Sequence, residues 1–134
     1  MLHNDILLRT DELPWTPLVE GISVKLLFSS KESGRWTVLL NCEEGSSFAK
    51  HKHFGPGEYY VVHGEMDYRA GVAVTGDYGY EPLGAVHECT TFPEETLLHF
   101  TNYGPVLFLD EEDNVISVLD NAFLEELVSA TAAD

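Results

Sequence analysis

The chain has 134 residues, a length that supports one hydrophobic core and leaves little room for a second domain. Its 7 basic residues are outnumbered by 23 acidic ones, and the formal net charge of −16 repels nucleic-acid phosphates and anionic lipid surfaces. No stretch approaches the roughly 20 apolar residues of a membrane helix, so we expect neither nucleic-acid nor membrane binding.

The predicted secondary structure is almost entirely β. Short runs rich in β-branched, aromatic and leucine residues are separated by turn signals that contain glycine, proline and acidic residues. The expected strands are 22–28, 36–42, 59–63, 72–74, 96–101, 106–109 and 115–119. Many short strands of this kind predict an all-β sandwich or barrel, with a core at about 20–119 inside a single domain of residues 1–134.

Only the C-terminal segment has a helical pattern. Its apolar residues recur at helical spacing behind Asp120, which is a suitable N-cap. These apolar residues are Phe123, Leu124, Leu127 and Val128. We therefore expect one short helix at about 120–131.

Two separate segments place histidines at a spacing that suits one metal ion. His51 and His53 lie two residues apart, and in a β-strand such residues project from the same face. A second segment, 76–87, contains glycines and a proline and ends in His87. Three neutral imidazoles can bind Zn, Fe, Ni or Cu and leave positions open for water or substrate. His51, His53 and His87 are therefore the predicted metal ligands.

Together the two segments resemble the two sequence motifs of the cupin superfamily. The matching residues are Gly45, His51, His53 and Gly64 in the first motif, then Gly76, Pro82, Gly84 and His87 in the second. The resemblance implies a jelly-roll β-barrel or sandwich that holds a metal ion on its motif histidines.

One departure from the first motif distinguishes the kind of cupin. The position at which cupins usually carry a metal-binding glutamate, counted back from Gly64, is Gly57, and Glu58 follows it. A shift of one residue turns a side chain to the other face of a strand, so we expect Glu58 to point away from the metal unless a bulge at 55–57 turns it inward. The chain then resembles the three-histidine cupins, which include 2,4′-dihydroxyacetophenone dioxygenases, acetylacetone-cleaving dioxygenases and the cupin domain of a zinc-binding anti-sigma factor.

The resemblance to the dioxygenases implies one Fe(II) ion and cleavage of a carbon–carbon bond of a small diketone or hydroxyketone by O2. The sequence does not select the metal, because metal availability overrides ligand identity. Zinc in the same triad would instead suit a non-catalytic zinc-binding or ligand-sensing module. Zinc or nickel would also suit a metal-dependent isomerase or lyase, because either ion can polarise a carbonyl.

Glu81, six residues before His87, is the predicted catalytic residue. A carboxylate beside a histidine-bound metal can orient a ligand through a hydrogen bond or accept a proton from the substrate. The alternative is a solvent-facing loop acid. An aromatic pocket wall is expected from some of Trp36, Phe48, Tyr59, Tyr78 and Tyr80.

The remaining histidines and the cysteines lead to further expectations. We expect His63 at the surface, and His99 either on the pocket wall or in the core. Cys42 and Cys89 are too few for a disulfide scaffold, and no basic and apolar leader opens the chain, so a cytoplasmic location is expected. A homodimer is expected because the apolar strand at 22–28 and the amphipathic C-terminal segment have surface to bury.

Overall fold

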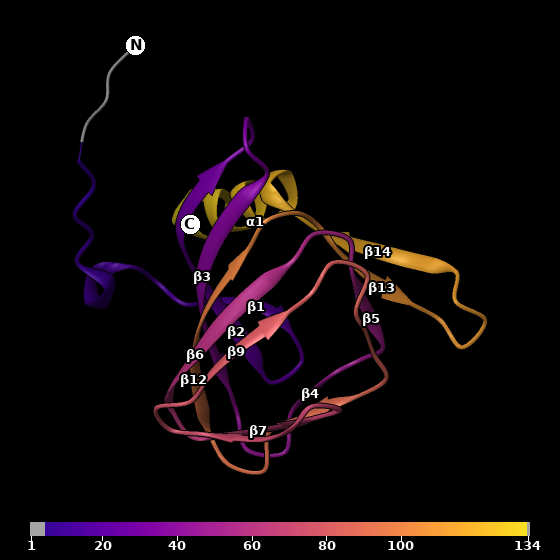
Figure 1. Ribbon diagram of the computed structural model, residues 1–134. Coiled ribbons are helices and arrows are strands. Elements are labelled where there is room, and N and C mark those ends of the chain that lie inside the picture. Colours follow the sequence, from indigo (N-terminus) through magenta and orange to yellow (C-terminus); the bar gives the residue numbers. More distant parts are fainter. Residues whose placement is uncertain (1–4, 134) are drawn as a thin grey trace.

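Three antiparallel sheets form a sandwich in the computed structural model, which describes residues 5–133 (Figure 1). The largest sheet contains β1 (Thr16–Val19), β2 (Ile22–Ser30), β3 (Arg35–Cys42), β12 (Thr96–Asn102), β6 (Gly57–His63) and β9 (Tyr78–Glu81), in that order. The second contains β10 (Val86–His87), β5 (His51–His53), β13 (Val106–Leu109) and β14 (Val115–Leu119). The third contains β4 (Ser47–Phe48), β11 (Thr90–Thr91), β7 (Glu65–Tyr68) and β8 (Gly71–Val74). All seven predicted strands are present.

The hydrophobic core lies between these sheets and follows the alternation of side chains along each strand. On β12, for example, Leu98 and Phe100 are buried, whereas His99 between them is exposed. The expectation that His99 lines the pocket or the core is therefore wrong, because its register places it on the outer face. His63 is exposed, as expected.

Strand β2 lies in the interior of its sheet, paired with β1 on one side and β3 on the other. Its residues Ile22 and Val24 are already buried in the core. The apolar character of this strand is thus explained by folding, and it does not support the homodimer that the sequence suggested.

The helix α1 (Asn121–Ala133) follows β14 and packs against β1, β2 and β14. Asp120 is its N-cap, since the side-chain oxygen Oδ1 accepts a hydrogen bond of 2.9 Å from the backbone N–H of Phe123. Leu124 is fully buried and Leu127 packs against the core, but Phe123 is 44% exposed. A short 3-10 helix, η1 (Thr10–Glu12), precedes β1. No helix within the described residues is long and apolar enough to cross a membrane.

The sequence pattern did not predict several short strands. The strand β1 contains Pro17, and β9 contains Gly79, two residues that are depleted in strands. Strands β4 and β11 contain two residues each, which is too few for a periodicity to appear. The strand β9 matters most for function, because it forms an edge of the largest sheet and ends at Glu81.

Candidate metal centre

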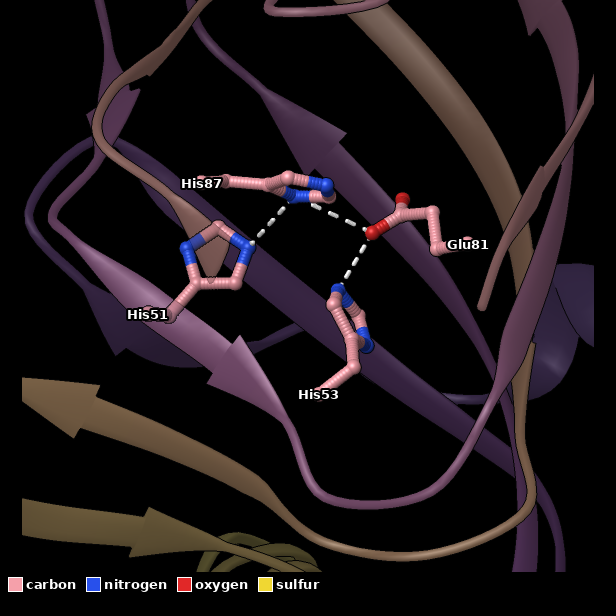
Figure 2. Close-up of side chains that lie close together, drawn as sticks. All are labelled: His51, His53, Glu81 and His87. Atoms are coloured by element: carbon pink, nitrogen blue, oxygen red, sulfur yellow. Dashed lines mark hydrogen bonds and ion pairs between the residues drawn. The ribbon is translucent and has the colours of Figure 1, made fainter. Parts of the chain in front are cut away.

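Four side chains from two different sheets converge on one buried point (Figure 2). His51 and His53 project from the same face of β5, as their spacing predicts. Strand β10 pairs with β5 so that His87 lies directly opposite His51. Glu81 reaches the same point from the end of β9 in the largest sheet. The fold therefore brings together the three predicted ligands and the predicted catalytic carboxylate.

The donor atoms are close enough to share one ion. One nitrogen from each of the three histidines and one oxygen of Glu81 all lie within 4.8 Å of one another. Two donors bound to the same ion at about 2.1 Å can lie up to about 4.2 Å apart, so small side-chain adjustments would bring all four into range. His51 Nε2 and His87 Nδ1 are 3.2 Å apart, and His87 Nδ1 is 3.1 Å from Glu81 Oε2.

The outer nitrogens of two histidines are held by acceptors, which fixes the nitrogen that faces the centre. The Nδ1–H of His51 donates to the carbonyl oxygen of Ala49 at 2.8 Å. The Nδ1–H of His53 donates to Oδ1 of Asn102 at 3.2 Å. Because both acceptors can only accept, Nε2 of each neutral imidazole keeps its lone pair for a metal.

Burial keeps two of these imidazoles neutral. It lowers the pKa of His51 to about 4, and it also lowers the pKa of His87, an effect that the neighbouring Glu81 carboxylate partly opposes. Both rings are therefore unprotonated at neutral pH, which is the form that binds metal ions.

One contact in the cluster is best satisfied by a cation. Nε2 of His53 and Oε2 of Glu81 contact one another, and both atoms are buried without a hydrogen bond. Since Nδ1 of His53 carries the proton, a neutral ring would direct its Nε2 lone pair at a carboxylate oxygen, which is repulsive. A divalent ion between them would remove this repulsion, so the residues present fit a metal.

The two acidic residues near the site point in opposite directions. Glu81 is only 3% exposed, so the alternative of a solvent-facing loop acid is wrong. Glu58 lies on the outer face, where its carboxylate accepts hydrogen bonds from the hydroxyls of Tyr78 (2.6 Å) and Tyr103 (3.0 Å). The register of β6 against β9 is regular from Gly57 onward, and no bulge turns Glu58 inward, as expected.

A small apolar cavity adjoins the histidines. It has a volume of about 50 Å³, and its walls include His51, His53 and Asn102. Trp36 and Phe48 line it, as expected. The other three aromatic residues do not: Tyr59 is buried outside its walls, and Tyr78 and Tyr80 are exposed on the outer surface.

Asn102 is the residue of this centre that the sequence analysis missed. It is 2% exposed and continues the inward-facing series Leu98, Phe100, Asn102 along β12. A polar residue at an inward position of a strand is a usable signal, because a buried amide needs a partner. The partner itself, His53, is 49 residues away in the sequence and is not predictable without the fold.

Comparisons with known proteins identify relatives of this chain. The model of the ChrR cupin-like domain family matches residues 3–107. The acetylacetone-cleaving enzyme of Acinetobacter johnsonii is 44% identical over 103 residues, covering 72% of this chain and 67% of that protein. The solved structure of an acetylacetone dioxygenase from the same organism has a TM-score of 0.87 at 35% identity, over 98% of this chain and 94% of the other. An RmlC-like cupin from Ralstonia eutropha JMP134 shares the fold, with a TM-score of 0.88 at 24% identity over 98% and 89% of the two chains. This chain therefore belongs to the ChrR cupin-like domain family.

Proposed function

We propose that this protein is a mononuclear non-haem iron(II) dioxygenase that cleaves a carbon–carbon bond of a small diketone or hydroxyketone. The observation that carries the proposal is the convergence of three buried imidazoles and one carboxylate beside a small apolar cavity. The similarity to an acetylacetone-cleaving enzyme supports this choice of substrate class.

In this proposal His51, His53 and His87 hold the ion. A bound Fe(II) would act as a Lewis acid toward the substrate enolate and would provide the redox chemistry that O2 requires. Zinc in the same ligand set would polarise a carbonyl but would not reduce O2.

In this proposal the cavity walls and Glu81 also contribute to the reaction. The apolar walls of the cavity exclude water from the reacting carbon, and its small volume favours compact substrates. The carbon between two carbonyl groups is acidic. The proposal assigns Glu81 as the base that accepts its proton as the enolate forms, because Glu81 is buried and its Oε2 contacts Nε2 of His53, a residue of the cavity wall. The same oxygen lies 3.1 Å from His87 Nδ1, the ring nitrogen that faces the cluster.

The test is oxygen consumption by protein loaded with Fe(II) under anaerobic conditions. We expect uptake of O2 with at least one small β-diketone or α-hydroxyketone, together with two fragments detected by mass spectrometry. The matched control is the same protein loaded with zinc, which should consume no O2. Tight zinc binding without uptake for any compound would instead indicate the ligand-sensing module, and conversion without uptake would indicate the isomerase or lyase.

We also propose a homodimer located in the cytoplasm. Large apolar side chains are exposed on neighbouring strands of the largest sheet, among them Tyr60 and Val62 on β6 and Tyr78 and Tyr80 on β9. Cys42 and Cys89 are free thiols, which suits a reducing compartment. Sedimentation at micromolar concentration that shows only a 14.9 kDa species would contradict the dimer.

A further inference from the structure

We propose that Asn102 is a positioning residue for the metal centre: its side-chain oxygen holds His53 in the orientation and tautomer that bind the ion. This inference rests on the metal site of the proposed function and assigns a role to a residue outside the ligand set. It also explains why a glycine, rather than a side chain, occupies position 57.

The position of Asn102 is fixed on both sides by the sheet. It ends β12, where it is paired with Trp36 of β3 and with Gly57 of β6. Its side chain is 2% exposed, and Oδ1 lies 3.2 Å from Nδ1 of His53. A buried acceptor held between two neighbouring strands has little freedom to move away from the ring.

The contact selects the useful form of His53. A neutral imidazole carries its proton on one of two nitrogens, and an amide oxygen can only accept, so the proton is held on Nδ1. Nε2 then keeps its lone pair and faces the point where Glu81 and the other two histidines converge, which is where the ion would bind. The plane of the ring is fixed as well, because it stacks on Phe100 with an interplanar angle of 3°.

Gly57 is required by the same arrangement. A Cβ added at Gly57 would lie 2.6 Å from Oδ1 of Asn102 and 2.9 Å from Cε1 of Phe100. Both distances are well below van der Waals contact, so any side chain at this position would displace the amide from His53 or move the ring that His53 stacks on. The Asn102 side chain thus fills the space over Gly57, and the carboxylate of the cluster comes from Glu81, which is paired opposite Gly57 on β9.

Among the three histidines, His53 offers the clearest test of such a role. The outer nitrogen of His51 is held by a backbone carbonyl, which no side-chain substitution removes. The outer nitrogen of His53 is held by a side chain, so its contribution can be measured.

The experiment compares Asn102→Leu, which keeps the approximate size but removes the acceptor, with Asn102→Asp, which keeps an acceptor oxygen. Metal dissociation constants are measured by competition with a chelator, using Zn(II) and Co(II), and the Co(II) absorption spectrum reports on the ligand field. We expect Asn102→Leu to weaken metal binding by about 10- to 100-fold and to change the Co(II) spectrum. Asn102→Asp should keep both the metal affinity and the Co(II) spectrum close to those of the wild-type protein. The matched control is Asn41→Leu, the same change on the outward-facing side of β3, which should leave both readouts unchanged.

Several results would overturn the inference. Wild-type affinity and an unchanged Co(II) spectrum in folded Asn102→Leu would show that the amide does not position His53. Equal weakening in the Leu and Asp variants would show that packing, rather than the acceptor, is what matters. If Asn102→Leu does not fold, Asn102→Ala removes the acceptor without adding apolar bulk, and the same two readouts apply. Failure of the wild-type protein to bind any divalent ion would refute the proposed function itself, which separates the two failures.

Discussion

Replacing Glu81 by glutamine tests the carboxylate of the metal centre with almost no change in shape. The Oε2 atom of Glu81 contacts Nε2 of His53 and lies 3.1 Å from Nδ1 of His87, and the side chain is 3% exposed. The substitution Glu81→Gln removes the negative charge while keeping the side-chain volume. We expect the fold to persist and both metal affinity and turnover to fall.

The magnitude follows from the contacts that are lost. An interaction with a charged group in a buried site contributes about 1.5 to 3 kcal/mol. At about 1.4 kcal/mol for each factor of ten, metal binding should weaken roughly 10- to 100-fold. Turnover should fall by about 100-fold or more if Glu81 also accepts the substrate proton.

The assay measures metal content and oxygen consumption on the same sample, so that the two roles can be separated. Loss of activity in proportion to metal loss would show that Glu81 only supports the ion. Loss of activity at full metal occupancy would show that it accepts the proton. Glu58→Gln is the matched control, because its carboxylate lies on the outer face with the Tyr78 and Tyr103 hydroxyls and should affect neither quantity. Wild-type metal affinity and turnover in Glu81→Gln would refute the reasoning.

Three further predictions concern the packing at Gly57, the reactivity of the two thiols and the pKa of His51. Gly57→Ala should lower the free energy of unfolding by about 1 to 3 kcal/mol in a denaturant titration, because the new Cβ overlaps the Asn102 side chain; an unchanged midpoint would contradict this packing. In the native protein, a thiol reagent should modify the exposed Cys89 and should reach Cys42 only after unfolding. Burial raises the pKa of Cys42 to about 12, so its reactive thiolate form is scarce. Rapid modification of both cysteines would contradict the burial of Cys42. In metal-free protein, the lowered pKa of His51 means that the unfolded chain binds a proton more readily below pH 6.5 than the folded one does. The free energy of unfolding of the wild-type protein, measured by denaturant titration, should thus fall by about 3 kcal/mol more between pH 6.5 and pH 4 than that of His51→Gln. A difference in unfolding free energy between the two proteins that does not change with pH would contradict the pKa shift.

The sequence was sufficient for the features that depend on local spacing. Runs of β-branched, aromatic and leucine residues predicted seven of the strands, and the two-residue spacing of His51 and His53 placed both rings on one face of β5. The alternation of side chains also predicted that Glu58, one residue after Gly57, points away from the metal, and its carboxylate does lie on the outer face. Asp120 was identifiable as an N-cap because its function is local.

The features that escaped prediction depend on contacts between distant segments. Glu81 was predicted beside the metal, but its neighbours in the sequence left a loop acid as the alternative, and its burial follows from the pairing of β9 with β6. The contact of Asn102 with His53 requires β12 and β5 to face one another across the sandwich. His99 was misplaced because its apolar neighbours, Leu98 and Phe100, face the core while its own position faces outward.

The most direct test of the account is the stoichiometry of divalent metal binding under anaerobic conditions. The account predicts one Fe(II) ion per chain in the wild-type protein and a sharp loss in each of His51→Ala, His53→Ala and His87→Ala, because two remaining imidazoles leave the ion open on too many sides. Undiminished metal content in all three folded variants would contradict the assignment of this cluster as the metal centre.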